Sequence, residues 1–403
     1  MFSFNLFSRE IKPYAIPSPF LLPAYARVLL LFYRGCTEHF RAAVQPKLLY
    51  FFSCFLSSSG QWEKKLIFVR LIFIWLIFSR LTRPVPDVRI KINSFTGGNM
   101  FINEQSLISL NGMPQYVSIR AQKKDAPLLL YLHGGPGDAA LPLVMKFSRG
   151  LEENFTVVVW EQRGAGKSYY RFEGGAVTME TFLQDLLSLT AILLERFRQN
   201  CLYLVGHSWG SVLGLTFTAR HPELVKTYIG CGQVVNMKKS CRTAYEYALA
   251  HADSKSLERL RTTDCTYTGD NWLSDLLFVT KQVVKHKGSL YGKTNYNKLI
   301  TPFLFSGCYS LPDLLRRQKG SLQAIRHLWP ELMETDFEGV TRFGTPVIFI
   351  EGRYDSHVSS ELAREYFETI ETEKQFFCFE KSCHFPQWSE NDRFNRLLAE
   401  VLL

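Results

Sequence analysis

Residues 201–220, CLYLVGHSWGSVLGLTFTAR, place a tightly constrained turn between two regular elements. An apolar run typical of a buried strand ends at Val205, and residues 206–210 then read Gly-His-Ser-Trp-Gly before a helical pattern begins. Glycines at both ends of such a turn permit the sharp passage from strand to helix that lifts the central residue clear of the sheet. This G-x-S-x-G pattern predicts that Ser208 is a nucleophile.

A serine nucleophile requires a base that takes its proton and an acid that holds the base, and here the expected order along the chain is serine, acid, base. The strand expected at residues 347–351 is followed by Asp355, which we prefer as the acid over Glu351 inside the buried run. His384 is the candidate base, because His357 lies too close to the acid in sequence to reach the serine. We expect the acid to raise the pKa of the base modestly, so that turnover falls as pH drops through about 6 to 7.

Backbone amides able to hold a developing negative charge are expected in residues 132–137, Leu-His-Gly-Gly-Pro-Gly, which close another apolar run. In sites of this kind a loop at this place supplies one donor, and the residue after the nucleophile supplies the other. We assign the two donors to the amides of Gly135 and Trp209, with Gly134 as the alternative to Gly135. His133 is interpreted as a structural residue that holds the loop by hydrogen bonds.

Neither a metal nor a cofactor is expected. Residues 160–168, WEQRGAGKS, end like a phosphate-binding loop, but that loop requires a glycine where this chain has Glu161. The nine cysteines include no C-x-x-C pair, so neither a zinc site nor a dense disulfide framework is indicated.

The chain after residue 86 alternates short apolar runs with amphipathic stretches, which is typical of an α/β fold with a mostly parallel sheet between helices. We expect strands at 128–132, 156–160, 202–205, 227–231, 347–351 and 375–379, and helices at 179–197, 212–220, 359–370 and 391–403. The strand rhythm stops between 232 and 344, where a largely helical cap is expected. Residues 86–231 and 345–403 would then form the core.

Residues 1–85 differ from the rest in composition. Residues 1–84 carry 11 basic and three acidic side chains, and so account for most of the net charge of +10. Since positive and negative charges nearly balance in the rest of the chain, we expect no nucleic-acid binding. The apolar segment 66–81 is a candidate membrane segment, although its apolar run is shorter than the roughly 20 residues that span a bilayer. A membrane-anchored and a cytoplasmic protein with a poorly ordered extension are the alternatives.

Several motifs together resemble the prolyl iminopeptidase-like branch of the α/β-hydrolase superfamily. They are HGGPG (133–137), WEQRGAGKS (160–168), GHSWG (206–210), GRYD (352–355) and the late His384. The resemblance covers about residues 105–403. It implies an α/β-hydrolase fold with an inserted helical cap. It also implies removal of an N-terminal residue, often proline, from short peptides, with the substrate amine held by carboxylates of the cap.

The chain departs from this branch at two places. Glu161 stands where such peptidases usually have aspartate, and the cap contains only Trp272 and Trp329 instead of a motif of paired tryptophans followed by glutamate. The amine-binding acids are therefore not assigned by the resemblance. The candidates in the cap are Glu246, Glu258, Glu331, Glu334, Asp336 and Glu338, although a run of acids is typical of a solvated helix face.

Two functions stay open within the class of serine hydrolases that use an acyl-enzyme. One is an aminopeptidase acting on short peptides, and the other is a carboxylesterase or lipase acting on small acyl esters. The second predicts an apolar site lined by cap residues such as Phe303, Phe305, Leu328 and Trp329. A non-catalytic binding protein is disfavoured because serine, histidine and aspartate are all present. The sequence indicates no oligomeric state.

Overall fold

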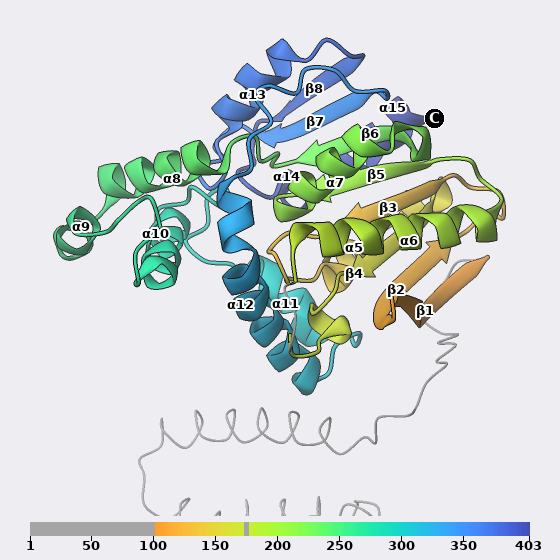
Figure 1. The fold of residues 1–403 in the computed structure, drawn as a ribbon, viewed down its shortest axis with the longest axis horizontal. Helices are drawn as coiled ribbons and strands as arrows, with labels where there is room; N and C mark the ends of the chain where they lie inside the picture. Colours follow the sequence, from red (N-terminus) through yellow and green to blue (C-terminus); the bar gives the residue numbers. More distant parts are fainter. Residues whose placement is uncertain (1–100, 173–176) are drawn as a thin grey trace, which may run out of the picture. The chain divides into compact units, whose positions relative to one another are not determined.

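The computed structural model describes residues 101–172 and 177–403, and these residues build one eight-stranded sheet (Figure 1). Its order is β1-β2-β4-β3-β5-β6-β7-β8. β1 pairs antiparallel with β2, and β2 with β4, while all other neighbours are parallel. The strands are β1 (Ile102–Leu110), β2 (Met113–Ala121), β3 (Leu128–Leu132), β4 (Thr156–Glu161), β5 (Leu202–His207), β6 (Val225–Cys231), β7 (Val347–Gly352) and β8 (Lys374–Phe379).

Both faces of the central strands are buried. In β3, Leu128, Leu130 and Leu132 belong to the core on one face of the sheet. Leu129 and Tyr131 belong to the core on the other face. A strand that is covered on both sides has no polar face, and this explains why the parallel strands read as continuous apolar runs.

Helices cover both faces of the sheet. The first core contains side chains of α6 (Met179–Phe197), α7 (Trp209–Arg220) and α13 (Ser360–Thr369). The second contains side chains of α5 (Leu141–Phe147), α14 (Pro386–Ser389) and α15 (Asn391–Leu402). The arrangement is the three-layered α/β fold that the sequence predicts.

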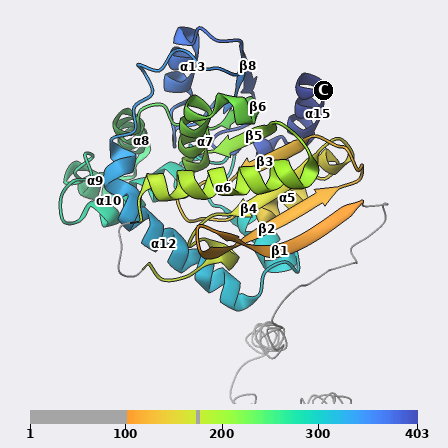
Figure 2. The same ribbon diagram turned by 45° about the vertical axis from the view of Figure 1, so that its right-hand side comes forward.

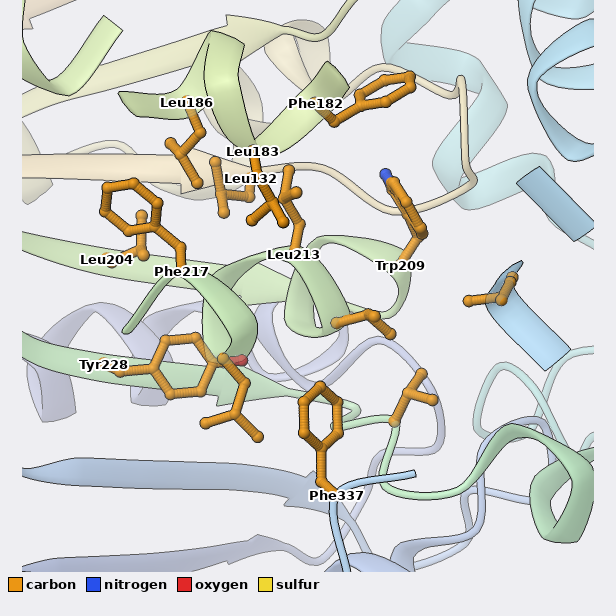
Figure 3. Packing of buried hydrophobic residues seen from close by; sticks show 14 of the residues in the cluster. Leu132, Phe182, Leu183, Leu186, Leu204, Trp209, Leu213, Phe217, Tyr228 and Phe337 are labelled. Carbon is orange, nitrogen blue, oxygen red and sulfur yellow. The ribbon is translucent and has the colours of Figure 1, made fainter. Parts of the chain in front are cut away.

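The first core fixes the beginning of α7 (Figure 3). Leu183 of α6 lies close to Leu213 of α7, and Leu186 lies on the side of Phe217. The Trp209 ring packs edge-on against Phe182, with centroids 5.6 Å apart. Burying one such large side chain contributes about 1.5–3 kcal/mol. The residue that follows Ser208 is therefore anchored in the core.

Five helices occupy the stretch between β6 and β7, where a helical insertion is expected. They are α8 (Met237–His251), α9 (Ser254–Arg261), α10 (Trp272–Lys285), α11 (Asn297–Phe305) and α12 (Leu311–Met333). Figures 1 and 2 show them gathered beyond the carboxyl ends of the parallel strands. α12 touches the core directly, because a Cβ on Gly137 would lie 2.6 Å from the backbone oxygen of Gly320.

The six expected strands are confirmed, with β3 matching its expected bounds and the others extending by one or two residues. α6 also matches its expected bounds, and α7 begins at Trp209, earlier than the expected start at 212. The β1–β2 hairpin was not expected. Its turn contains Asn111 and Gly112, both with positive φ, and Asn-Gly between two strands is a strong hairpin signal.

The candidate membrane segment 66–81 and the rest of residues 1–85 lie outside the described residues. Within residues 101–172 and 177–403, no helix combines the length and the apolar character that crossing a membrane requires.

Candidate active site

Ser208 lies at the turn between β5 and α7 in a backbone conformation that is rare for residues other than glycine. Its φ and ψ angles are 54° and −120°. A Cβ on Gly206 would lie 2.4 Å from the Gly210 oxygen, and a Cβ on Gly210 would lie 2.3 Å from the Leu132 oxygen. Only glycine fits at these two positions. The G-x-S-x-G pattern therefore has a steric cause, and its result is a serine presented at the carboxyl end of a central strand.

His384 and Asp355 form a buried pair on the loops that follow β8 and β7. Nδ1 of His384 lies 2.9 Å from Oδ2 of Asp355. The other carboxylate oxygen, Oδ1, accepts the backbone N–H groups of His357 and Val358 at 2.8 and 3.0 Å. Since a carboxylate accepts hydrogen bonds, the imidazole carries its proton on Nδ1 and keeps a lone pair on Nε2. The pair has the geometry of a base held by an acid.

Glu351, the alternative acid, has a hydrogen-bond partner other than His384. It is buried in β7, and its Oε1 atom accepts the backbone N–H of Gln233 at 2.8 Å. Burial raises the pKa of Glu351 well above its usual range. Within the described residues Glu351 makes no hydrogen bond to His384, so it does not orient the base.

Ser208 and His384 both contact the backbone at the end of β6, at Cys231 and Gly232. The N–H of Ser208 donates to the oxygen of Cys231 at 3.1 Å, and a Cβ on Gly232 would lie 3.0 Å from Nδ1 of His384. Nε2 of His207 also donates to the backbone oxygen of His384 at 2.9 Å. Within the described residues, no hydrogen bond joins the serine hydroxyl to the imidazole. In enzymes without substrate such bonds are often long and tighten only on binding.

The loop after β3 passes directly against the serine. A Cβ on Gly134 would lie 3.1 Å from the Cβ of Ser208. In the described part of the chain, the amides of Gly134, Gly135 and Trp209 have no hydrogen-bond acceptor. The amide of Trp209 is also one of the free N–H groups at the start of α7, where negative charge is favoured. The assignment of the oxyanion donors to Gly135 and Trp209 stays a prediction, with Gly134 the closer neighbour of the serine.

His133 has the contacts of a structural residue. Its Nε2 atom accepts the backbone N–H of Gln162 at 3.0 Å, and its Nδ1 atom donates to the oxygen of Gly134 at 2.8 Å. The Gln162 side chain in turn accepts the indole N–H of Trp209 at 2.8 Å. Burial lowers the pKa of His133 to about 4, so the ring is neutral and able to accept. These bonds tie the loop after β3 to the beginning of α7.

Burial controls the charge state of His384. It lowers the pKa of this imidazole below its usual value of 6.5, contrary to our expectation that Asp355 would raise it. Burial also raises the pKa of Asp355, against the effect of the N–H donors of Val358 and His357. Because the loss of solvation outweighs the attraction between the two groups, His384 is neutral at neutral pH and can accept a proton.

We therefore expect kcat/KM to fall at a lower pH than in an enzyme whose base is a solvent-exposed histidine. The base must be neutral to act, so activity should stay level from pH 8 to about 6.5 and fall only at lower pH as His384 becomes protonated. The measurement is a pH profile of kcat/KM with a chromogenic substrate. An apparent pKa of 6.5 or above would contradict the role of burial.

Apart from Glu258, which is exposed in α9, the acidic residues of the cap considered for amine binding have partners of their own. Glu246 pairs with Arg242, Glu334 with Lys238 and Glu338 with Lys239, at 2.9, 2.8 and 2.5 Å. Glu331 accepts the backbone N–H of Met179 at 2.9 Å. With Glu334 and Asp336 it lines a hollow of about 510 Å³ beside α7, and the residues that line this hollow include neither Ser208 nor His384.

The four apolar residues considered as an acyl site do not line one common surface. Leu328 and Trp329 belong to the core that contains α6 and α7, and the Trp329 ring stacks on Trp272 at 5.1 Å. Phe303 belongs to the core on the other face, and Phe305 is 67% exposed. The structure does not bring these residues together.

Asp138 is an acid beside the candidate oxyanion loop that the sequence analysis missed. It follows Gly137, and a Cβ on Gly135 would lie 3.3 Å from the Asp138 Cβ. Its side chain is 37% exposed, and its carboxylate lies 2.5 Å from Nε of Arg317 in α12. The negative charge of Asp138 acts on His133 and His207, which flank the site. Its place directly after the HGGPG loop is the sequence signal that could have identified it.

Glu161 joins the core to the cap. It is fully buried at the end of β4, where the hydroxyl of Tyr309 donates to Oε1 and the N–H of Lys167 donates to Oε2 at 2.6 Å. Burial raises the pKa of Glu161 to about 7, although the hydrogen bond from Tyr309 opposes the change. The position where the branch usually has aspartate thus holds the segment before α12 against the core.

Fold and site together define a serine hydrolase of the α/β type. The family model of the alpha/beta hydrolase fold matches residues 127–391, and the chain belongs to this family. Within it, the chain falls in the prolyl iminopeptidase-like branch. It is 31% identical over 298 residues to the probable aminopeptidase YbaC of Bacillus subtilis, which covers 72% of this chain and 94% of that protein.

Two further proteins are similar to this chain, one in sequence and one in fold. The proline iminopeptidase of Heyndrickxia coagulans is 21% identical over 290 residues, covering 68% of this chain and 90% of that protein. The crystal structure of the proline iminopeptidase of Mycobacterium smegmatis is similar in fold, with a TM-score of 0.57 at 18% identity. That match covers 74% of this chain and 97% of the other.

Proposed function

We propose that this chain is an aminopeptidase that hydrolyses short peptides or aminoacyl amides through an acyl-enzyme on Ser208. The observation that carries the mechanism is the buried pair of His384 and Asp355, held at 2.9 Å beside a serine on a strained turn. Nε2 of His384 takes the serine proton while Oγ bonds to the substrate carbonyl carbon. The same proton then passes to the leaving amine, and water repeats the sequence to release the acid.

The amides of Trp209 and Gly135 are the proposed donors to the carbonyl oxygen as it becomes negative. The support for this assignment is their freedom from other acceptors in the described residues and the position of the glycine loop against the serine. Such donors stabilise the transition state more than the substrate, since the full charge exists only after attack.

The helices α8–α12 are proposed to form a cap over this site, with residues 232–344 as its bounds. Contacts at both ends support the proposal. The N–H of His384 donates to the oxygen of Ser289 at 3.1 Å, and α12 touches the loop after β3 at Gly320. A cap that contacts both the base and the candidate oxyanion loop would limit the size of the substrate.

The preference for amine-bearing substrates is proposed to depend on Asp138. The Bacillus relative is described as a probable aminopeptidase, and an aminopeptidase must pair the ammonium group of its substrate, because an unpaired buried charge is costly. Asp138 is partly exposed and lies beside the candidate oxyanion loop, where a substrate ammonium would share its carboxylate with Arg317. Glu334 and Glu338 pair instead with lysines of α8. A small molecule or short peptide with a free amine is therefore the proposed substrate.

Asp138→Asn is expected to lower kcat/KM for prolyl and other aminoacyl anilides by about tenfold or more, the usual effect of removing a charged hydrogen-bond partner. Short neutral acyl esters should be cleaved at nearly the wild-type rate. The measurement is a substrate panel on both proteins. Glu334→Gln is the matched control, since that acid pairs with Lys238 and should affect neither substrate.

Two results of this panel would contradict the proposals, one for the aminopeptidase activity and one for Asp138. One is wild-type protein that leaves prolyl anilide uncut and cleaves a short acyl ester rapidly, which would favour a carboxylesterase or lipase. The other is an equal loss on both substrates in Asp138→Asn, which would reject amine binding by Asp138 and assign that residue to the structure of the loop. Association with membranes through residues 66–81 stays a prediction from the sequence.

A further inference from the structure

The imidazole of His384 is enclosed by two other histidine rings. The ring of His357 stacks on it, with centroids 4.6 Å apart and planes inclined by only 17°. The ring of His207 lies 4.9 Å away and is tilted by 45°. Gly232 closes the edge that carries Nδ1 and Cε1, where a Cβ would come within 3.0 and 3.1 Å. Among these neighbours, only His357 lies nearly parallel to the base.

His357 is itself held in place. Its backbone N–H donates to Oδ1 of Asp355 at 2.8 Å, so its position is fixed by the same acid that holds the base. Its Nδ1 atom lies 3.4 Å from the hydroxyl of Ser289, which is 2.5 Å from the hydroxyl of Tyr296. Both of these residues come from the segment between α10 and α11. The stacked ring is thus fixed from the core and from the inserted helices.

His357 is neutral in the resting protein. Burial and the neighbouring His384 lower its pKa to about 3. The other titratable groups near the two rings are Asp355, His207, Cys383 and Tyr296. The charge of Asp138 also acts on Tyr296 and His207. Burial raises the pKa of Cys383 to about 12 and also raises that of Tyr296, so both are neutral.

The charge on His384 changes during the proposed reaction. It is neutral before Ser208 attacks and becomes an imidazolium when Nε2 takes the serine proton. The face of a neutral aromatic ring attracts a cation, and a stacked neutral imidazole therefore stabilises the charged form more than the neutral form. An interaction that is stronger in the transition state than in the ground state raises kcat without a matching change in KM.

We propose that His357 is a positioning residue that stabilises the imidazolium form of His384 by ring stacking. The proposal rests on the function proposed above, in which Ser208 is the nucleophile and His384 the base. The order of the motifs along the chain gives His357 no role. The proposal gives this residue, two positions after the acid Asp355, a part in the reaction.

The test compares His357→Val, which removes the aromatic face, with His357→Phe, which retains it. In the full-length protein, His357→Val is expected to lower kcat about tenfold with KM nearly unchanged. The acid limb of kcat/KM should move to lower pH, because the imidazolium has lost a stabilising contact. His357→Phe should recover most of kcat and of the pH profile.

Unchanged kcat and an unchanged pH profile in His357→Val would overturn the proposal, and so would equal losses in the Val and Phe variants. If His357→Val does not fold, Ser289→Ala provides the second variant. It frees one side of the ring and should lower kcat a few-fold with KM preserved, whereas wild-type kcat would count against the proposal.

Parallel labelling with a fluorophosphonate separates this proposal from the one on which it rests. Labelling that depends on Ser208, together with wild-type kcat in His357→Val, would leave the proposed function standing and reject the role of His357. Labelling and turnover that persist in Ser208→Ala would instead reject the proposed nucleophile.

Discussion

Replacing Ser208 by alanine is expected to lower kcat by about a millionfold, the loss that follows removal of the nucleophile in serine proteases. The fold should persist, since the hydroxyl of Ser208 makes no hydrogen bond within the described residues and its Cβ remains. Turnover of the preferred substrate and labelling by a fluorophosphonate are the two measurements. A thermal melting point close to that of the wild type would separate lost chemistry from lost structure.

Ser211 offers a matched control three residues further along the chain. Its hydroxyl donates to the oxygen of Ser208 at 2.6 Å and accepts the N–H of Val234 at 3.0 Å, so it is fully engaged in structure. Ser211→Ala should still be labelled and should still turn over substrate. Labelling that disappears in this variant and persists in Ser208→Ala would exchange the roles of the two serines.

Asp355→Asn is expected to lower kcat by about ten-thousandfold. The asparagine oxygen can still accept the N–H groups of His357 and Val358, which leaves its NH₂ group facing Nδ1 of His384. A donor at this place forces the imidazole proton onto Nε2, which is the nitrogen that must accept from the serine. The variant would be folded, but its base would be in the wrong tautomer.

The control for this substitution is Glu351→Gln, a similar exchange at the end of the same strand. Glu351 accepts the N–H of Gln233 and does not contact His384, so the rate should change by less than about tenfold. Melting curves for both variants belong to the experiment. A small effect of Asp355→Asn beside a large effect of Glu351→Gln would mean that the acid was misassigned.

The central sheet could be predicted from the sequence because its strands are buried on both faces. Leu128 to Leu132 in β3 have no polar side, and such a run is recognised without knowledge of its neighbours. The hairpin of β1 and β2 escaped recognition because β1 lies at the edge of the sheet and is only partly buried. Its side chains alternate less clearly, and only the Asn-Gly turn identifies it.

Some residues of the candidate site could likewise be predicted from the sequence, and others could not. Ser208, Asp355 and His384 follow from local turns and from their order along the chain, and such signals are present in the sequence itself. Asp138 and His357 acquire their contacts from segments far away, since the partner of one is Arg317 in α12 and the other stacks on a loop beyond β8. No pattern within a few residues of His357 contains that information, and the only local signal for Asp138 is its place directly after the HGGPG loop.

The buried histidines of the site also couple its chemistry to the stability of the fold. Burial lowers the pKa of His133 to about 4 and those of His207 and His384 to about 3, each from 6.5. Between these values the unfolded chain binds protons at these histidines that the folded chain excludes, so their contribution to the free energy of unfolding decreases as pH falls below about 6.5. The raised pKa values of the buried Glu161 and Asp355 act in the opposite direction over the same range. The protonation of His384 that ends turnover therefore falls in the same pH range in which the buried histidines contribute less to the stability of the fold.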